Sequence, residues 1–308
     1  MQPRSEVIVA SLIFTLVLLG NAVIFSIVPY LSKPEYGFEL HAFQIFFCYC
    51  FIAMLCMVPW ALKQGVAGLK RPKMKLYSAR AILEFSAFSA SFYSLQYLGV
   101  GFDLSTHTAL NFITPLLATV AAIFILKEHS YAHTWGALLL GFVGVLVITR
   151  PGMVETSPGV VYVLLAATMF SLCGIVIKLL TSTESPQHVA FFMLSMTALI
   201  AAPFGIYHWK TPIAEGFLWL GVIGVIGYAQ QVLIAKAIAK VPYMTLIPLN
   251  FLQLVFASIL SYIVYDMLID SWTLAGAVII LAATLGNAYM NTKRSVRKDM
   301  PEAPAESS

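Results

Sequence analysis

Charged residues are scarce in this chain, since Asp, Glu, Lys and Arg together make up only 10% of its 308 residues. Hydrophobic residues make up 60%, and the mean hydropathy is +0.86. A water-soluble globule of this length has no means of hiding so much apolar surface. The composition therefore excludes a soluble protein and predicts an all-α polytopic membrane protein.

Catalytic and metal-binding motifs are also missing. The sequence contains no HExxH, GxSxG, paired CxxC or Walker motif. Its four cysteines fall inside apolar stretches, where they behave as small apolar residues and not as a disulfide framework. His129 and His133 stand at i, i+4 spacing, but Glu128 is the sole further ligand type beside them. We therefore expect no enzyme, no cofactor and no metal site.

Apolar stretches of about 20 residues, the length that crosses about 30 Å of hydrocarbon as a helix, fill nearly the whole chain. They are too long for barrel strands and show no strict alternation of apolar and polar residues. Only six residues precede the first, which is too long for a signal-peptide core and has no cleavage site after it. The ten expected spans are 7–30, 42–62, 79–98, 104–126, 134–150, 158–180, 188–208, 214–236, 242–264 and 272–291.

The lysines and arginines gather on one side of these spans. Three lie on the other side, at Lys33, Arg150 and Lys210, out of 18 in all. Because basic residues favour the cytoplasmic side, we expect both termini to be cytoplasmic. The residues on that side are Arg4, Lys63, Lys70, Arg71, Lys73, Lys75, Arg80, Lys127, Lys178, Lys236, Lys240, Lys293, Arg294, Arg297 and Lys298.

Two segments about 140 residues apart resemble each other, 106–149 and 244–286. Each contains an interior proline and asparagine, an aliphatic run, an acid and then a Gly-Ala pair: Glu128 with Gly136-Ala137, and Asp266 with Gly276-Ala277. The chain is thus expected to divide into a first repeat at 1–150, a second at 151–291 and a disordered cytoplasmic tail at 292–308. Five spans per half is an odd number, so the halves are expected to be inverted, as in many secondary transporters.

The ten spans, the two halves, the acid followed by Gly-Ala and the prolines of the fourth and ninth spans resemble the EamA branch of the drug/metabolite transporter superfamily. The resemblance covers about 7–291. Within that branch, 157–180, the Pro203…Trp209…Pro212 stretch and 273–280 are most similar to uptake transporters for S-adenosylmethionine, with riboflavin importers close behind. The family also includes exporters of amino acids and other metabolites.

Polar residues inside the spans mark the candidate substrate site, because such side chains usually face a bundle interior or a cavity. Glu84 is the one carboxylate placed well inside a span. His107 and Asn111 share a face of the fourth span, and Asn250 and Gln253 share a face of the ninth. Because these spans correspond in the two halves, we expect their polar faces to converge on one central cavity.

Aromatic residues are expected to complete this cavity. Phe88 and Phe92 lie on the Glu84 face of the third span, and Tyr228 precedes Gln231 in the eighth. A planar cargo would stack on such rings, and a sulfonium or ammonium would be attracted to a ring face or to Glu84. Packing without ligand contact is the alternative for each aromatic residue.

Glu84 has two interpretations. It is either a carboxylate that binds a proton or a cation within the membrane, or the partner of Arg80 at the cytoplasmic rim. Pro115 and Pro248 interrupt two helical patterns and are gating candidates, although a static kink is an equal alternative. Lys178 is expected to extend toward water at the membrane interface.

The sequence thus predicts a secondary transporter that moves a small organic metabolite across the bacterial inner membrane by alternating access. Uptake of a cargo like S-adenosylmethionine or riboflavin is the leading hypothesis. Export of amino acids is an alternative, and a non-transporting sensor or scaffold is an alternative of another class. Partner hypotheses are the lipid bilayer, protons as a coupling ion and a homodimer, with no nucleic acid.

Overall fold

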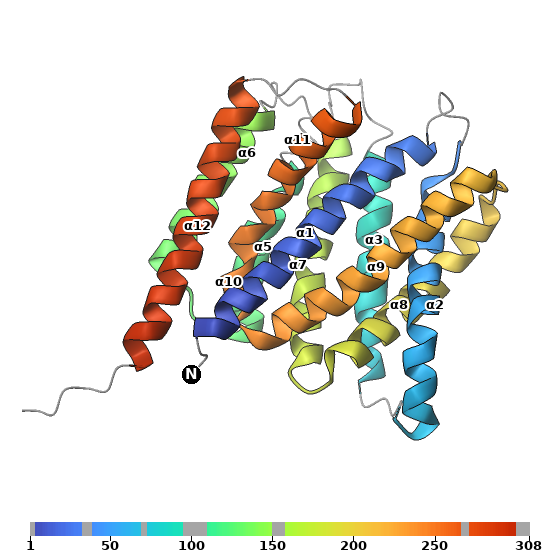
Figure 1. The fold of residues 1–308 in the computed structure, drawn as a ribbon, viewed down its shortest axis with the longest axis horizontal. Helices are drawn as coiled ribbons and strands as arrows, with labels where there is room; N and C mark the ends of the chain where they lie inside the picture. The colour runs from blue at the N-terminus through green and yellow to red at the C-terminus, as the bar shows by residue number, and fades with distance from the viewer. Residues whose placement is uncertain are drawn as a thin grey trace, which may run out of the picture.

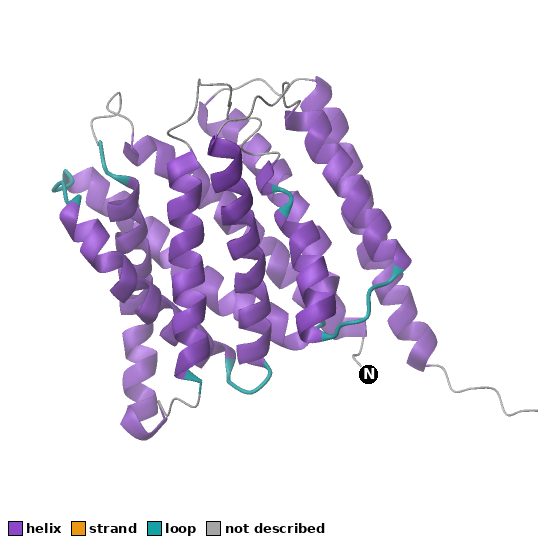
Figure 2. Cartoon of the chain, turned by 180° about the vertical axis from the view of Figure 1, so that it is seen from behind, coloured by secondary structure: helices purple, strands orange, loops and turns teal. Residues whose placement is uncertain are grey.

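The computed structural model describes residues 4–32, 39–68, 73–94, 110–149, 158–265 and 271–299. All regular secondary structure within these ranges is helical, and the helices lie side by side as a bundle (Figures 1 and 2). The helices are α1 (Arg4–Ser32), α2 (Ala42–Gly68), α3 (Met74–Ser94), α5 (Thr114–Leu126), α6 (Ala132–Thr149), α7 (Pro158–Thr181), α8 (Pro186–Tyr207), α9 (Ala214–Lys240), α10 (Tyr243–Leu246), the 3-10 helix η3 (Ile247–Phe251), α11 (Leu252–Tyr265) and α12 (Ser271–Asp299).

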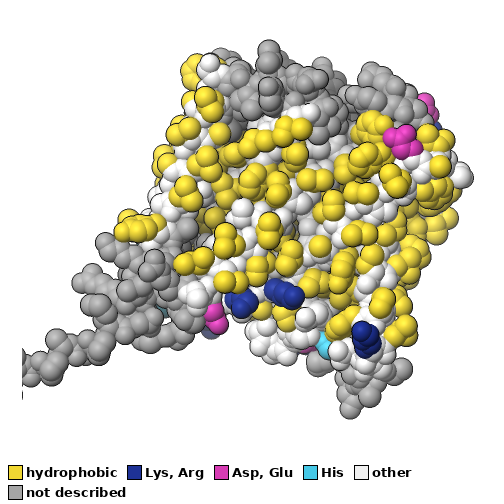
Figure 3. Space-filling view, viewed as in Figure 1, with side chains coloured by type: hydrophobic (Ala, Val, Ile, Leu, Met, Phe, Trp, Pro, Cys, Tyr) yellow, Lys and Arg dark blue, Asp and Glu magenta, His cyan; other side chains and the backbone are white. Residues whose placement is uncertain are grey.

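Six stretches within the described ranges are long and apolar enough to cross a membrane, and three shorter apolar helices accompany them. Helices suit this environment because every backbone hydrogen bond is made within the segment. Apolar side chains cover the face of the bundle shown in Figure 3, and lysines and arginines gather along its lower edge. This outer surface matches a lipid environment.

Two helices extend past the expected spans. α3 begins at Met74, five residues before the expected start, because Tyr77 at its polar beginning donates a hydrogen bond to Glu184 in the α7–α8 connection. α12 continues past residue 291 to Asp299, so the first part of the expected tail is helical. Its charged residues are tolerated there because Lys and Arg form helices readily in water. Residues 300–308 lie outside the described ranges.

The ninth expected span contains a 3-10 stretch inside its helix. Its residues form the short α10, then η3 with Pro248 in its first turn, and then α11. In the first half, a turn at 112–113 precedes α5, which has Pro115 in its first turn. The two interruptions lie together, since the rings of Phe112 and Phe251 stack with centroids 6.0 Å apart.

The two halves run in opposite directions through the bundle. α1 begins at the edge that carries the N-terminus, whereas α7, the first helix of the second half, ends at that edge in its turn to α8 (Figure 1). The α5–α6 connection lies at the same edge (Figure 2). Inverted repeats are thus present, as the odd number of spans per half requires.

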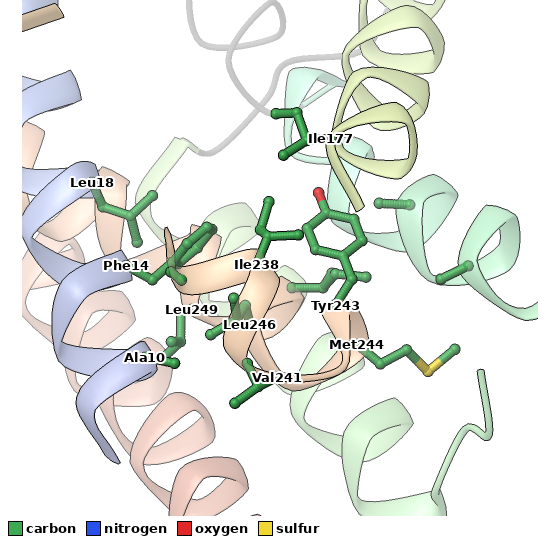
Figure 4. Packing of buried hydrophobic residues seen from close by; sticks show 14 of the residues in the cluster. Ala10, Phe14, Leu18, Ile177, Ile238, Val241, Tyr243, Met244, Leu246 and Leu249 are labelled. Atoms are coloured by element: carbon green, nitrogen blue, oxygen red, sulfur yellow. The ribbon is translucent and has the colours of Figure 1, made fainter. Parts of the chain in front are cut away.

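The main apolar core joins both halves. Phe14 and Leu18 of α1 lie with Ile238 of α9, and Tyr243 and Leu246 of α10 pack beside them (Figure 4). Most of these side chains are fully buried. A second contact depends on small residues, as expected for helices packing in lipid. A Cβ on Gly227 of α9 would lie 2.2 Å from the Tyr49 ring of α2, so only glycine permits this approach.

Candidate functional site

A buried ion pair occupies the middle of the bundle. Nη2 of Arg80 donates to Oε1 of Glu84 at 3.1 Å, and Nη1 lies 2.9 Å from Oε2. The hydroxyl of Thr197 on α8 donates to Oε2 at 3.0 Å. The side chains of Arg80 and Glu84 are only 6% and 15% exposed. The Glu84 carboxylate therefore receives donors from both halves of the chain.

The depth of the pair follows from the helix geometry. Glu84 lies ten residues after Met74, the first residue of α3, which is about 15 Å along the helix. Thr197 lies eleven residues after Pro186 in α8, a similar depth. The Arg80 partner is found as the second interpretation of Glu84 expected, and the position of the pair relative to the cytoplasmic rim stays a prediction.

Other polar groups surround the pair. Cys173 of α7 and Tyr49 of α2 are electrostatic neighbours of Arg80. The Tyr49 hydroxyl interacts in turn with Gln231 of α9, which is buried. Gln231 thus belongs to the group around Glu84, as expected. These residues come from α2, α3, α7 and α9, so the polar centre lies where the two halves meet.

An aromatic cluster adjoins the carboxylate. Phe88 stacks on Phe46 with centroids 4.1 Å apart, and Phe92 lies 5.3 Å from Phe43. Phe85, next to Glu84 in the chain, lies 4.7 Å from Phe204 of α8. The members of this aromatic cluster are His41, Phe43, Phe46, Phe85, Phe88, Phe92, Phe204 and His208. Phe88 and Phe92 thus pack against rings of α2, one and two turns along α3 from Glu84.

Tyr228 has different surroundings. It packs against an apolar cluster of α2 and α8 that includes Met57 and Leu194. The structure therefore gives Tyr228 a packing contact, and its expected role in the cavity stays a prediction.

The polar residues of the fourth and ninth spans lie at the helix interruptions. Asn111 is just before the 112–113 turn, and the Asn250 side chain donates to the carbonyl of Ile247 at 2.8 Å within η3. Gln253 is half-buried and is the second residue of α11. No hydrogen bond joins these three to Glu84 among the residues described. His107 lies outside the described residues.

A second contact between the halves was not foreseen from the sequence. The Glu128 carboxylate, in the α5–α6 connection, accepts hydrogen bonds from the backbone amides of Tyr243 and Met244, both at 2.9 Å. These amides begin α10, where a negative charge is favourable. The acid in the repeated signature therefore ties the first half to the start of α10.

Lys178 of α7 caps the carboxyl end of α9, the helix before α10. Its Nζ donates to the carbonyls of Ile238 and Val241 at 2.8 and 2.6 Å, at the carboxyl end of α9. A cation is favourable at this helix end. Lys178 is half-buried at these contacts, and its expected extension toward water at the membrane interface stays a prediction. No group of three potential metal ligands occurs among the described residues.

Part of this site had no signal in the sequence. Thr197 stood alone in an apolar run. Tyr49 and Cys173 likewise looked like packing residues. One signal for Arg80 was its i, i+4 spacing to the lone intramembrane carboxylate, which a helix turns into contact.

Known proteins resemble the whole chain. The model of the EamA-like transporter family matches residues 12–150 and 157–289. The chain is 29% identical to an S-adenosylmethionine uptake transporter of Rickettsia prowazekii over 83% of this chain and 86% of that protein. It is 26% identical to solute carrier family 35 member G1 of Mus musculus over 86% of this chain and 75% of that protein.

The fold is also known. A solved crystal structure superposes with a TM-score of 0.74 at 17% sequence identity, covering 94% of this chain and 99% of that one. Together with the bundle of membrane-length helices and its inverted halves, these matches show that the chain is a multi-pass transporter of the inner membrane rather than an enzyme. The chain belongs to the EamA-like transporter family.

Proposed function

We propose that this protein imports S-adenosylmethionine, or a closely related cationic metabolite with an aromatic ring, by alternating access between its two halves. The observation that carries the proposal is the buried Glu84 carboxylate beside the aromatic cluster. A carboxylate attracts a sulfonium or ammonium, and Phe85 and Phe88, within one turn of it along α3, belong to a cluster of rings that a planar cargo would join by stacking. The S-adenosylmethionine uptake transporters among the relatives support the same cargo.

The interrupted helices suit alternating access. Pro115 and Pro248 each stand in the first turn after an interruption, and the stacked Phe112 and Phe251 lie between the two segments. A 3-10 stretch or a proline within a helix often marks a hinge, which lets one half of the helix move while the other stays. We propose that these two sites are the hinges, with Asn111, Asn250 and Gln253 next to the cargo path.

Glu84 is also the proposed coupling group. Within the described residues its carboxylate is buried, and it receives donors from α3 and α8. Proton binding to it would compete with a cationic cargo. A proton gradient is therefore expected to change uptake through this residue.

The experiment is uptake of labelled S-adenosylmethionine by proteoliposomes, beside riboflavin and a panel of amino acids. We expect saturable uptake of S-adenosylmethionine and loss of that uptake in Glu84→Gln. A matched control is Glu39→Gln, which removes the carboxylate of an exposed ion pair with Lys210. Uptake of riboflavin alone would refute the proposed cargo, and uptake by Glu84→Gln at the normal rate would refute the role of the carboxylate.

A further inference from the structure

Arg80 has more hydrogen-bond donors than the structure uses. A guanidinium carries five N–H donors and no acceptor. In the described part of the chain, only Nη2 makes a hydrogen bond, to Glu84. Nε is buried without a hydrogen-bond partner. Nη1 makes no directed hydrogen bond, but it is paired with the Glu84 carboxylate at 2.9 Å. The residue as a whole is 5% exposed.

Such an arrangement is costly unless a ligand completes it. A buried charged donor without an acceptor loses its hydration and gains nothing in exchange. Native proteins satisfy nearly all such groups, so each exception calls for a missing partner. The ionisable groups that act on Arg80 are Glu84, Cys173 and Tyr49. Neither the thiol nor the phenol is an acceptor that matches the planar fork of two N–H groups, whereas a carboxylate is.

We infer that Arg80 and Glu84 together hold the zwitterionic head of an α-amino acid, with the cargo carboxylate on the free donors of Arg80 and the cargo ammonium at Glu84. This inference rests on the proposed function and deepens it, because it names the part of the cargo that is recognised. The opposite charges stand one helical turn apart on α3, as a zwitterion requires. The aromatic cluster then takes the ring of the cargo.

The inference predicts which compounds bind, because it requires a carboxylate in the cargo. S-adenosylmethionine carries an α-amino-acid head and an aromatic ring, so it fits both parts of the site. Riboflavin has no carboxylate and leaves the donors of Arg80 unsatisfied. Because the donors are buried here, the cargo reaches them in an open state of the transporter.

The test compares ligands that differ only in the carboxylate. The pairs are S-adenosylmethionine and its decarboxylated form, L-tryptophan and tryptamine, and L-methionine and 3-(methylthio)propylamine. Binding is measured as thermal stabilisation of the full-length detergent-solubilised protein against ligand concentration. We expect the carboxylated member of at least one pair to bind about tenfold or more tightly, the effect of one charge-assisted contact.

Variants of Arg80 test whether this residue causes the preference for the carboxylated ligand. In Arg80→Gln the affinity ratio of the pair should fall to about one, whereas a purely structural role would weaken both members equally and leave the ratio unchanged. If Arg80→Gln does not fold, Arg80→Lys keeps the charge, loses the fork and should lower the ratio. Lys210→Gln, which breaks the exposed Lys210–Glu39 ion pair, is the matched control and should keep the ratio.

The outcomes distinguish the inference from the proposed cargo. Carboxylate preference in the tryptophan or methionine pair, without binding of S-adenosylmethionine, upholds the inference and refutes that cargo. Uptake of S-adenosylmethionine with equal binding of its decarboxylated form overturns the inference and leaves the proposed function. A ratio that survives both Arg80 variants, or no carboxylate preference in any pair, also overturns it.

Discussion

At the scale of single residues, the central feature is a pair of opposite charges held in the middle of an apolar bundle. Removing one member of a buried ion pair leaves the other without compensation, which is commonly more damaging than removing both. Arg80 and Glu84 meet these conditions, since each is almost fully buried and their nearest side-chain atoms are 2.9 Å apart. Stability and transport are therefore expected to respond differently to changes in the pair.

Replacing Glu84 alone should destabilise the fold. Glu84→Gln leaves the Arg80 guanidinium without a counter-charge, and we expect a cost of about 3–5 kcal/mol, seen as a lower melting temperature. The double variant Arg80→Gln, Glu84→Gln should recover part of that stability but no transport. A double variant whose loss equals the sum of the single losses would contradict the coupling of the two charges.

His41 gives stability a dependence on pH. It lies just before α2, stacked on His208 with centroids 3.9 Å apart. Burial lowers the pKa of His41 below 6.5, and the charges of His208 and Lys210 lower it further. Lys210 is itself paired with Glu39 at 3.1 Å, which is the carboxylate on this segment.

The sign follows from the direction of this shift. Above about pH 6.5 the imidazole is neutral in the folded and unfolded chain, so its contribution to stability is complete. As pH falls below that value, the unfolded chain binds the proton first, and the melting temperature should decrease. We expect the melting temperature of His41→Gln, measured by thermal unfolding in detergent, to change less between pH 7 and pH 5 than that of the unaltered protein. An unchanged slope in this variant would assign the effect to other groups.

At the scale of the elements, glycines set how closely the helices approach. A Cβ at Gly227 would lie 2.2 Å from the ring of Tyr49, whereas a Cβ at Gly221 on the same helix would have no neighbour within 4 Å. The contact matters for the site, because Tyr49 connects Gln231 to the surroundings of Arg80. Packing and chemistry thus depend on the same glycine.

Two alanine variants of α9 test this packing. Gly227→Ala should move α9 away from α2, destabilise the protein by about 1–3 kcal/mol and reduce transport. Gly221→Ala should be neutral or slightly stabilising, because alanine favours the helix and meets open space. Both effects are measured by melting temperature and uptake. Equal behaviour of the two variants would show that this approach does not limit the fold.

The helices were largely predictable, and their breaks and contacts were not. Apolar runs long enough to cross a membrane indicate where helices lie, as with 158–180, observed as Pro158–Thr181. The polar start of α3 was missed because the contact between Tyr77 and Glu184 joins residues far apart in the sequence. Glu128 was recognised as part of a repeat, but its contact with the start of α10 requires the packing of both halves.

At the scale of the whole molecule, the inverted halves account for where the polar centre lies. Glu84 comes from the first half and Thr197 from the second, and the two breaks meet through Phe112 and Phe251. Substrate sites of inverted-repeat transporters lie near the midplane between the halves. This arrangement gives each half a share in the same carboxylate.

The distribution of lysine and arginine predicts the orientation of this bundle. Ser5 is exposed at the start of α1, and Thr211 is exposed in the α8–α9 connection near the opposite edge. In intact cells, a membrane-impermeant maleimide should label Thr211→Cys and leave Ser5→Cys unlabelled until the membrane is opened. The unaltered chain, with its four free cysteines, is the control. The reverse pattern of labelling would place the termini outside.

Transport of S-adenosylmethionine by alternating access is tested most directly by a counterflow experiment. Proteoliposomes loaded with unlabelled S-adenosylmethionine are placed in a low concentration of the labelled compound, and the label inside is followed over time. A carrier that exposes one site to each side in turn should accumulate label transiently above its outside concentration, and Glu84→Gln should abolish this. Label that never exceeds the level of empty liposomes would contradict the account.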